Sequence, residues 1–585
     1  MPRMNNARIA ELIERVADLL EIKGTNPFRL RAYRNVVRTL RDLPEPAETI
    51  LADPDRSLTD IKGIGKDLAE KIATIAATGT LPLLEELLEE IPESVLSILR
   101  IPGLGPKKAA VLYHDLKITT LDQLQAACEA HKVAELKGFG NKTEQTILAG
   151  IPLAARAEQR IYWATADEIA QLLLEHLRAC KSLQQIEVAG SYRRGRETVG
   201  DLDLLVVSDH HEEVMDRLAE FDSVEQTIGR GDTKMSIRLA GGLQVDLRVV
   251  PAESFGAALQ YFTGSKAHNV ILRCMAKSRG LKINEWGVFR VAEDDDGAHG
   301  EDDEYIAGRS EEEVYAAIDL PYFPPEIREA RGEFEWAERG ELPELIELGD
   351  IRGDLHMHTT ASDGRASIEE MIAAAQQRGL KYIAITDHSK RVSMANGLDG
   401  DRLLAQWAEV DRINAGLEDF TVLKGVEVDI LEKGGLDIAD DVLAQADWIV
   451  ASVHYGQKQS SEQITDRIIG AIENRHVSAI AHPTGRLINR RERYEVDTEA
   501  VMQAAAEHGK LLELNANPAR LDLDDVHCAG AKRHGIPVVI NTDAHSIAGL
   551  DVMRHGIQQA RRAGLTKADV ANTRTWKQLQ KLIGR

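Results

Sequence analysis

The feature that most constrains the fold is a series of short apolar runs after residue 350, each of which ends in polar residues. They alternate with amphipathic segments of helical periodicity and read KYIAITDHS (381–389), TVLKGVEVDI (421–430), WIVASVHYG (448–456), VSAIAHPTG (477–485), LLELNANP (511–518) and PVVINTDAHS (537–546). This alternation predicts a parallel sheet, either a barrel or a doubly wound sheet. Because the carboxyl ends of barrel strands build one face, the polar residues should meet there.

Histidines and carboxylates dominate these strand ends. Eleven of the eighteen histidines follow residue 350. His356 and His358 share one face of an extended segment and can bind one metal ion together, with Asp363 a short turn away. A lone histidine is usually structural, but core packing cannot plausibly explain the recurrence in TDH (386–388), GVE (425–427), VHY (453–455), AHP (481–483) and TDAH (542–545). We therefore predict a metal site.

The length of the chain predicts several domains besides this one. At 585 residues it is several times the usual domain size of roughly 100–200 residues. No apolar run approaches the ~18–20 residues that a membrane span needs. The start, MPRMNNARIAELIERV, enters an amphipathic helix without the pattern of a signal peptide. We expect a cytoplasmic protein that does not associate with membranes.

Cysteine usage excludes two kinds of stabilisation. The four cysteines lie far apart in the chain and show no C-x-x-C spacing. A disulfide framework and a thiolate zinc site are therefore both unexpected, and buried thiols are the simplest interpretation.

The net charge of −24 is unfavourable for a nucleic-acid-binding protein, since phosphate affinity comes largely from Lys and Arg. The acidic residues are unevenly distributed, however: the stretch AEDDDGAHGEDDE (292–304) alone carries eight of them. Local basic patches can still bind DNA. Acidic clusters elsewhere are either solvated surface or metal ligands.

A glycine pattern recurs in the first 150 residues, as IKGIGKDLAEKI (61–72), IPGLGPKKAAVL (101–112) and LKGFGNKTEQTI (136–147). A tight glycine turn before a helix offers backbone N–H groups and the positive end of the helix dipole to a phosphate. One copy alone is more often a cap between packed helices, but three copies resemble helix-hairpin-helix motifs, which grip the DNA backbone without reading sequence. The DNA-binding residues so implied are Gly63, Gly65, Gly103, Gly105, Lys107, Lys108, Gly138 and Gly140, with Lys62, Lys66, Lys137 and Lys142 nearby.

A second candidate metal site involves three aspartates. Asp201 and Asp203 stand two residues apart at the start of a predicted strand, so both carboxylates point to one face. Asp246, in the strand LQVDLRVV, can complete the cluster. Such carboxylates are costly together unless cations neutralise them, and two Mg²⁺ ions in the two-metal arrangement of polymerases are the natural solution. The alternative is a solvated strand edge.

The residues just before this strand favour the metal site. The Gly190-Ser191 turn, with Arg193 and Arg194, supplies a hydroxyl, backbone N–H groups and guanidinium groups suited to phosphates.

These motifs resemble a known family. GSYRRGRETVGDLD (190–203), VDLR (245–248) and YFTGSKAHN (261–269) closely resemble the nucleotidyl-transferase core of family X DNA polymerases, over roughly residues 1–318. The resemblance implies that Asp201, Asp203 and Asp246 hold the metals and that Asp246 also receives the proton of the primer hydroxyl. It further implies a triphosphate site at Ser191, Arg194 and Gly200.

The same resemblance implies a nucleotide-selecting segment. Tyr261, Phe262 and Gly264 would line the sugar, and Asn269 would reach the minor-groove edge of the incoming base. Without the other motifs, core packing would be the simpler interpretation of Tyr261 and Phe262.

The N-terminal segment is similar to the part that in some relatives removes a 5′-deoxyribose phosphate through a lysine Schiff base. Lys71 falls on the lysine position and Tyr33 also matches. Other basic positions of that pocket are Arg29, Asn35 and Asp67 here, which departs from the pattern. A DNA-backbone contact is the alternative role of Lys71.

The strand-end motifs after residue 348 resemble the PHP (polymerase and histidinol phosphatase) domain, a distorted parallel barrel that holds up to three Mn²⁺ or Zn²⁺ ions. Its nine ligand positions correspond to His356, His358, Asp363, His388, Glu427, His454, His482, Asp543 and His545. Asp387 and Asp429 would orient the ligands, and substrate phosphates would be held by Lys390, Arg391 and Arg486.

We therefore predict a multidomain chain of helical helix-hairpin-helix domains, an α+β nucleotidyl-transferase palm and a distorted parallel (β/α) PHP barrel. The expected parts are a lyase-like helical DNA-binding domain (1–85), a helix-hairpin-helix fingers-type domain (86–153), the palm (154–255), a nucleotide-selecting thumb-type domain (256–318), a linker (319–347) and the PHP domain (348–585).

The predicted function is the filling of short gaps in DNA repair by a bacterial polymerase, with 3′–5′ exonuclease or other 3′-end processing in the PHP domain. Abasic-site cleavage and removal of 3′-phosphates are further activities of this kind. The expected partners are gapped or primer-template DNA and dNTPs, and the expected state is a monomer. The alternatives are a DNA-end-binding scaffold with vestigial sites, or a small-molecule phosphatase with an accessory DNA-binding half.

Overall fold

The computed structural model describes the chain apart from residues 1–5, 44–46, 54–55, 62, 79, 93–94, 96–97, 99–100, 102–103, 105, 157–159, 291–303 and 585. The chain divides into two compact units. The first comprises residues 1–159 with the short segments 459–462 and 495–499, and the second comprises residues 160–458, 463–494 and 500–585. Among the described residues, no helix combines the length and apolar character that crossing a membrane requires.

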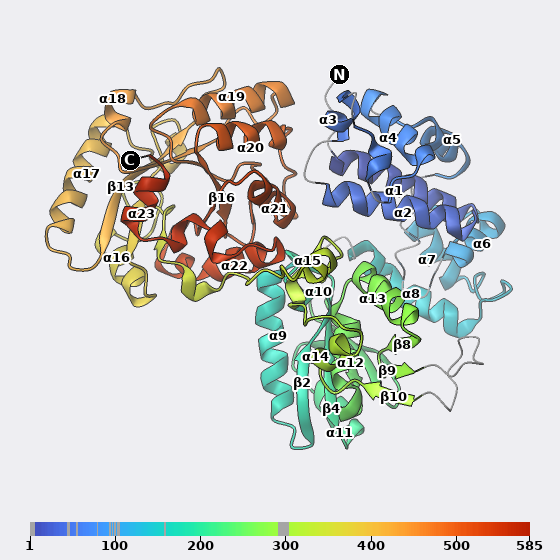
Figure 1. Ribbon diagram of the computed structural model, residues 1–585. Helices are drawn as coiled ribbons and strands as arrows, with labels where there is room; N and C mark the ends of the chain where they lie inside the picture. The colour runs from blue at the N-terminus through green and yellow to red at the C-terminus, as the bar shows by residue number, and fades with distance from the viewer. Residues whose placement is uncertain are drawn as a thin grey trace. The chain divides into compact units, whose positions relative to one another are not determined.

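The first unit is built from helices (Figure 1, blue to cyan). They are α1 (Asn6–Ile22), α2 (Pro27–Asp42), α3 (Ala47–Ala52), α4 (Lys66–Thr78), α5 (Pro82–Glu90), α6 (Pro106–Leu116), α7 (Leu121–Glu129) and α8 (Asn141–Arg156), with a 3₁₀ turn at Leu58–Asp60. Apolar residues of α1 at helical spacing, such as Ile9, Ile13 and Val16, are fully buried. One continuous core runs from Ile9 to Ile151 and so spans both of the helical segments that the sequence separates.

Local chemistry explains where these helices begin. The Asn26 side chain accepts a hydrogen bond from the N–H of Phe28, and Pro27 occupies the first turn of α2, where its missing N–H costs nothing. Before α4, Gly63 has a φ of +102°, which a residue with a side chain rarely adopts.

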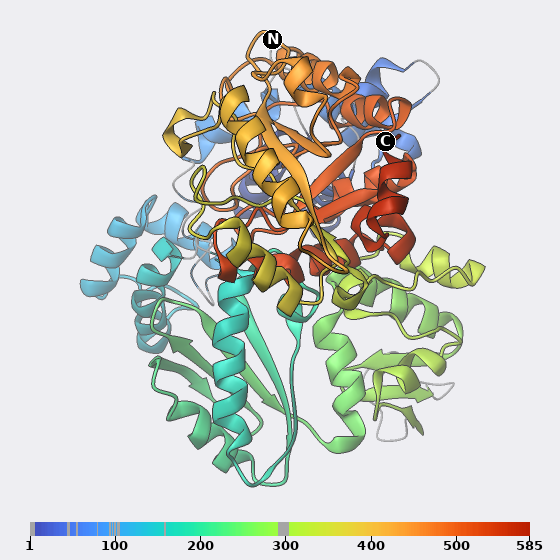
Figure 2. The same cartoon turned by 90° about the vertical axis from the view of Figure 1, so that its left-hand side faces the viewer.

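The second unit begins with a mixed sheet. It contains β2 (Leu183–Val188), β4 (Asp201–Ser208), β5 (Val224–Arg230), β6 (Lys234–Leu239) and β7 (Gln244–Val249) in the order β2-β4-β7-β6-β5. The helix α9 (Trp163–Arg178) lies alongside these strands (Figure 2, teal) and buries Ala166, Ala170 and Leu173. The other elements are β1 (Ile161–Tyr162), β3 (Thr198–Val199), α10 (Gly190–Arg193) and α11 (His211–Ala219).

The short β-branched runs IEVAGS, DLDLLVVS, MSIRLA and LQVDLRVV predict strands that correspond to β2, β4, β6 and β7, but β5 has no counterpart among the predicted strands. Six of its seven residues are exposed, so it lacks the alternation of apolar and polar residues by which a half-buried strand is recognised. It forms the edge of the sheet, where it pairs only with β6.

A thumb-like layer follows the sheet. It consists of α12 (Phe255–Thr263), α13 (Lys266–Ser278), β8 (Leu281–Asn284), β9 (Gly287–Arg290), β10 (Glu304–Ala307) and α14 (Glu311–Ala316), with a 3₁₀ turn at Ala252–Ser254. The segment 319–347, for which the sequence predicts a linker, packs into this layer: Phe323, Ile327 and Phe334 share a core with Leu272 and Val314. This segment contains α15 (Glu333–Arg339) and η4 (Pro325–Ile327).

Seven parallel strands then follow one another in chain order: β11 (Gly353–Asp354), β12 (Tyr382–Ile385), β13 (Thr421–Asp429), β14 (Trp448–Ser452), β15 (Ala479–Ile480), β16 (Leu511–Asn515) and β17 (Val538–Asn541). The last six coincide with the predicted apolar runs. A parallel bridge between Met357 and Ala544 links the segments that follow β11 and β17, so the sheet closes into a distorted barrel rather than a doubly wound sheet.

Helices cover the outside of the barrel (Figure 1, yellow to red). They are α16 (Ile368–Gln377), α17 (Gly400–Asn414), α18 (Asp440–Leu443), α19 (Ser461–Glu473), α20 (Thr498–Glu507), α21 (Asp525–Arg533), α22 (Met553–Arg562) and α23 (Trp576–Leu582), with short 3₁₀ turns at Leu348–Asp350, Ser393–Ala395, Ile547–Val552, Lys567–Asp569 and Ala571–Thr573.

Gly556 allows α22 to lie against the barrel strands. A Cβ at this position would come within 2.5 Å of the Ile540 side chain and 2.8 Å of the Ala516 Cβ. The exposed Gly470 in α19 has nothing within 4 Å of the same added atom and serves as a control.

We expect Gly556→Ala to lower the stability of the protein by about 1–3 kcal/mol, because the added methyl overpacks the contact between α22 and the barrel. Gly470→Ala should raise it by about 0.5–1 kcal/mol, as alanine does in a helix interior. Thermal unfolding midpoints of the two variants decide this. Equal shifts in the same direction would contradict the proposed packing.

Candidate functional site

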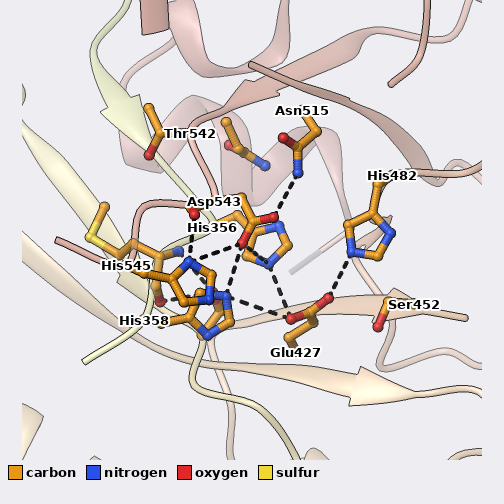
Figure 3. Close-up of polar contacts among 12 residues, drawn as sticks. His356, His358, Glu427, Ser452, His482, Asn515, Thr542, Asp543 and His545 are labelled. Carbon is orange, nitrogen blue, oxygen red and sulfur yellow. Dashed lines mark hydrogen bonds and ion pairs between the residues drawn. The ribbon is translucent and has the colours of Figure 1, made fainter. Parts of the chain in front are cut away.

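The barrel brings the predicted ligands together from segments far apart in the chain. His356 and His358 follow β11, His388 follows β12, and Glu427 lies in β13. The loops after β14, β15 and β17 contribute His454, His482, Asp543 and His545, and Asp363 comes from the loop before α16. Figure 3 shows the cluster around Glu427 and Asp543.

Glu427 lies at the centre of the cluster and is 1% exposed. Its carboxylate oxygens lie within 3.6 Å of nitrogens of five imidazoles: 2.8 Å from His388, 3.0 Å from His482, 3.3 Å from His356, 3.4 Å from His454 and 3.6 Å from His358.

Three overlapping groups of donor atoms have the spacing that a metal ion requires. In each group the donor atoms all lie within 4.8 Å of one another. The groups are His358, Asp363, His388 and His545; His356, His358 and Asp543; and His388, Glu427 and His454. Because His358 and His388 each belong to two groups, the metals would lie side by side.

The donor atoms themselves fit metal ions. The buried atoms His356 Nε2, His358 Nδ1, His388 Nδ1, His482 Nδ1 and Glu427 Oε2 make no hydrogen bond within the described part of the chain. The short contacts of Glu427 Oε2 with His388 Nδ1 and His356 Nε2 are ion-pair distances without hydrogen-bond geometry. Buried polar atoms are almost always paired, so a whole set without partners in one place indicates missing ligands. Imidazole with carboxylate suits Zn²⁺, Mn²⁺ or Fe.

The charged groups of the cluster shift one another's pKa values. Burial would raise the pKa of Glu427, but His388, His454 and His356 hold it well below its usual range. Burial and the neighbouring His388 lower the pKa of His358 to about 4. Burial would also lower the pKa of His454, yet Glu427 and Asp429 raise it to about 10. A neutral His358 keeps its nitrogen lone pair available for a metal.

Outer groups orient the ligands. Glu513 in β16 accepts hydrogen bonds from His356 Nδ1 and from the backbone N–H of His482, both at 2.7 Å. This contact fixes the ring so that His356 Nε2 faces the cluster. Asp429 contacts His454 Nδ1 at 3.1 Å. The sequence patterns indicated Asp429 but missed Glu513, whose only sequence signal is its place near the end of a predicted strand.

Two ligands sit in unusual backbone conformations. His482 and Asp543 have φ angles of +28° and +54°, in a region that non-glycine residues rarely adopt. Such conformations cluster at binding sites, where the surrounding structure holds them in place.

The basic residues near this cluster differ in their contacts. Arg391 is exposed at the rim, over the ring of Tyr455 at 4.9 Å and paired with Glu432. Lys390 is also exposed. Arg486, in contrast, is held by Glu197 at 2.7 Å and by the carbonyl oxygens of the 520–521 segment, so its guanidinium already has protein partners.

Arg520 is a basic residue that the sequence patterns did not indicate. Its Nε lies 3.7 Å from Asp543 Oδ2. Asp387, which the patterns placed in an orienting role, instead accepts hydrogen bonds from Thr359, Ser362 and Gln406 and so holds the loop after His358.

The palm sheet places its three aspartates on two neighbouring parallel strands. In the register of β4 and β7, Asp203 lies directly opposite Asp246, and Asp201 lies opposite Gln244. Gly190, with a φ of +69°, begins the short helix α10 beside Asp203, where any side chain would collide with the Asp203 carboxylate. The turn can therefore lie directly against the carboxylates.

The basic side chains around these three carboxylates do not neutralise them fully. Burial, Asp201 and Asp246 raise the pKa of Asp203 to about 7. Burial and Asp246 also raise the pKa of Asp201, which Arg160 and Arg194 oppose. Asp246 is held by hydrogen bonds from Ser236 and from Gln244. A set of three carboxylates that repel one another fits divalent cations with oxygen ligands.

The phosphate-binding candidates lie around this sheet. Arg194 is half-buried, with Nε donating to Glu329 at 3.0 Å and Nη1 donating to the Thr263 carbonyl at 2.6 Å. Arg193 is paired with both oxygens of Glu311 at 2.8 Å, a structural contact that engages both ends of its guanidinium. Ser191 is half-buried in α10.

Gly200 is exposed, and a Cβ there would lie 3.0 Å from Arg160 Nη1. Arg160, which the patterns missed, donates to the Thr198 carbonyl at 2.6 Å. The positive charge of Arg160 lowers the pKa of Asp201 and so partly offsets the effects of burial and Asp246.

The nucleotide-selecting candidates are closely packed. The rings of Tyr261 and Phe262 are 5.2 Å apart and edge to face. Asn269 donates to the carbonyl oxygens of Tyr261 at 2.7 Å and Gly264 at 3.3 Å. A side chain at Gly264 would collide with Asn269, which explains the glycine there.

The first and third hairpins have the expected form. Gly63 and Gly138 have positive φ, and Gly65 and Gly140 directly precede α4 and α8. Gly103, Gly105, Lys62 and the side chain of Lys107 lie outside the described part of the structure. Lys108 places its ammonium 5.6 Å from the centre of the Phe139 ring.

The lyase candidates lie within the same unit. Lys71 is paired with Asp67 one helical turn away, at 2.5 Å. Tyr33 is buried, and its hydroxyl makes no hydrogen bond among the described residues.

Family models match most of the chain. They are a helix-hairpin-helix domain at residues 4–81, a SAM-like helix-hairpin-helix tandem at 95–151, the DNA polymerase beta palm at 160–234, the DNA polymerase beta thumb at 258–329 and the PHP domain at 354–517. The predicted fold class is thereby confirmed.

Curated relatives match the whole chain or parts of it. A protein named DNA polymerase/3′-5′ exonuclease PolX, from Bacillus subtilis (strain 168), is 42% identical over 584 residues, which cover 100% of both chains. A probable phosphatase of Thermoanaerobacter sp. (strain X514) is 29% identical over 38% of this chain and 89% of its own. DNA polymerase lambda of Rattus norvegicus is 25% identical over 55% of this chain and 56% of its own. The chain therefore belongs to the family X DNA polymerases that carry a C-terminal PHP domain.

Proposed function

We propose that the chain fills short gaps in DNA at the palm and processes 3′ ends in the barrel. The observation that carries the second half of this proposal is the set of buried imidazole and carboxylate atoms without hydrogen-bond partners at the barrel strand ends. The first half rests on three mutually repelling carboxylates beside a glycine turn.

In the palm, Asp201, Asp203 and Asp246 would hold two Mg²⁺ ions. When bound, such ions activate a 3′-hydroxyl and stabilise the charge of a leaving pyrophosphate. Asp246 would accept the hydroxyl proton, since Ser236 and Gln244 already hold its carboxylate in place. Ser191, Arg194 and Gly200 would bind the triphosphate. Asn269 would contact the base, with Tyr261, Phe262 and Gly264 beside the sugar.

In the barrel, the nine ligands would hold up to three Mn²⁺ or Zn²⁺ ions. When bound, such ions would activate water for hydrolysis of a phosphate ester. Arg391 and Lys390 at the rim, with Arg520 beside Asp543, would hold the phosphates of the DNA end. A 3′–5′ exonuclease, an abasic-site endonuclease and a 3′-phosphatase would all use this arrangement.

The contacts favour this proposal over its alternatives. A scaffold with vestigial sites has no need of eight residues whose donor atoms form three groups with metal-ligand spacing, or of His482 against Glu427 beside them. A small-molecule phosphatase would account for the barrel alone. The probable phosphatase relative aligns with 38% of the chain, whereas the PolX relative aligns with all of it.

Other features of the proposal follow from the substrate. DNA backbone contacts would come from the hairpin glycines and lysines, and dNTPs would bind in the palm. A cytoplasmic location in a bacterium and a monomeric state remain predictions. Lys71, paired with Asp67, is proposed as a lyase nucleophile or as a DNA-backbone contact.

Asp201→Ala or Asp246→Ala should lower primer extension at least about 100-fold, because each removes a charge that the metal pair requires. Binding to gapped DNA should persist. The control is Asp209→Ala, an exposed aspartate just beyond the same strand β4, which should extend primers normally. Normal extension by the Asp201 variant would overturn the assignment of the palm site.

The double variant His356→Ala, His358→Ala should lose 3′-end degradation by more than about 100-fold, since two metal ligands are removed. Gap filling should survive. His508→Ala, which changes an exposed histidine after α20, provides the control. Extension and shortening of one labelled primer on gapped DNA, with Mg²⁺ and then Mn²⁺, measure both activities. If the double variant still degrades the primer, the barrel cluster is not the nuclease site.

Lys107→Ala with Lys108→Ala should weaken DNA binding similarly for all sequences and reduce the slope of log affinity against log salt by up to about 0.9 for each phosphate that the protein no longer neutralises. A matched control replaces Lys577 and Lys581, which are both exposed on α23, and removes the same charge. Binding measured between about 50 and 200 mM salt tests this. An unchanged slope would assign the second hairpin a purely structural role.

A further inference from the structure

The turn of the palm that carries Arg194 is held from the PHP barrel by helix α22. Arg562, the last residue of α22, donates from Nη1 to the backbone carbonyl of Arg194 at 2.7 Å. The same Nη1 lies 3.0 Å from Glu329 Oε1, and Nη2 lies 2.8 Å from Asp525 Oδ2. One side chain of the barrel thus contacts both the backbone of Arg194 and the carboxylate that pairs with the Arg194 side chain.

Glu329 connects the two arginines. Its Oε1 accepts from Arg194 Nε at 3.0 Å and from Arg562 Nη1 at the same distance. It is 8% exposed, and although burial alone would raise its pKa, Arg562 and Arg194 hold the pKa well below its usual range. Glu329 is therefore a buried anion, and its removal would leave two guanidinium groups facing each other.

These contacts determine the orientation of the Arg194 side chain. Its Nε is bound to Glu329 and its Nη1 to the Thr263 carbonyl. Nη2 has no hydrogen-bond partner among the described residues, so one end of the planar guanidinium stays available. Arg194 caps the short helix α10, whose first residue, Gly190, lies directly against the Asp203 carboxylate, so the Arg194 turn lies beside the palm carboxylates.

Basic side chains surround Glu329. Arg194 and Arg562 bind its carboxylate, and the charges of Arg196 and Arg331 also act on it. Asp525 is shared by Arg562 and Arg331. We call these six side chains the Glu329 cluster.

We infer that Glu329 and Arg562 are positioning residues of the polymerase site, through which the PHP barrel holds Arg194 ready for the triphosphate of the incoming dNTP. This inference rests on the proposed role of Arg194. Neither residue touches the nucleotide; each acts through the Arg194 side chain or backbone. Gap filling by the palm then depends on the presence of the barrel even when the metal cluster of the barrel is inactive.

The neighbouring Arg561 provides a matched control. It lies on the same helix and its Nε is paired with Glu326 at 2.7 Å, while its Nη1 donates to the Ile346 carbonyl at 3.0 Å. Arg561 thus also fastens α22 to the segment that follows the thumb, but the structure shows no contact between its side chain and Arg194. Removal of either arginine deletes one positive charge from the last turn of α22.

The experiment measures steady-state filling of a single-nucleotide gap by the full chain. Arg562→Ala should raise the KM for dNTP about tenfold and leave kcat within about twofold, because triphosphate binding is weakened while the carboxylates are intact. Arg561→Ala should leave the KM for dNTP unchanged. Arg562→Lys keeps the charge but cannot make the same forked contacts, so its KM should lie between those of the wild type and Arg562→Ala.

Two further measurements separate positioning from damage to the fold. Degradation of the 3′ end by the barrel should be normal in Arg562→Ala, which confirms that the variant is folded. The double variant Arg562→Ala, Glu329→Gln should raise KM by less than the product of the two single effects, since both act through Arg194.

An unchanged KM for dNTP in Arg562→Ala, or an equal rise in Arg561→Ala, would overturn the inference. A variant that fails to fold would show reduced degradation as well, and Arg562→Lys then decides: wild-type KM in that variant refutes the role of the forked contacts. Failure of the underlying function is distinguishable, because then the wild type itself would add no nucleotide or Asp201→Ala would still add it.

Discussion

Charge that is removed from water must be neutralised by a close neighbour, and three clusters of this chain meet that requirement in different ways. In the palm, burial and the neighbouring carboxylates raise the pKa of Asp203 and of Asp201, so cations must come from outside. In the barrel, Glu427 and Asp543 are surrounded by imidazoles, four of which have one buried ring nitrogen without a hydrogen-bond partner among the described residues. In the Glu329 cluster, arginine side chains of the chain itself neutralise the Glu329 carboxylate. The first two clusters are therefore suited to catalysis and the third to attachment.

The parallel order of the barrel explains how such distant residues form one site. His356 and His545 are separated by most of the domain, yet every strand between them ends on the same face. Glu427 lies near the end of β13, and the other predicted ligands lie in the segments that follow β11, β12, β14, β15 and β17. The outer residue Glu513 stands on the same face, where it orients His356 and His482 from the next strand. Any insertion on the opposite face would leave this arrangement intact, since the ligands depend only on strand order and register.

The sequence patterns gave correct predictions where a motif recurs along the chain. They failed where the role of a residue depends on a single partner from another part of the chain. The sequence patterns predicted the strand that begins at Asp201 and the six apolar runs of the barrel. The evidence was the alternation of residues and the polar residues that end each run. The strand β5 was missed because nearly all of its residues are exposed. Arg193 and Arg486 have the chemistry of phosphate ligands, but Glu311 and Glu197 bind them. The segment 319–347 reads as a linker because it is rich in turn-forming residues, although Phe323 and Phe334 are buried.

The sequence by itself determined the residue types and their order: the strand-end histidines, the D-x-D strand, the paired glycines and the alternation that requires parallel strands. These are local properties, since a side chain and its neighbours in the chain suffice to establish strand, turn or ligand chemistry. Only the tertiary structure decided which predicted ligands lie close to one another, that Glu513 orients His356, and that Arg562 reaches the backbone of Arg194 across 368 residues of chain. Such contacts depend on packing between segments that no local pattern relates, because ion pairs form with whatever charge the fold brings within a few ångströms.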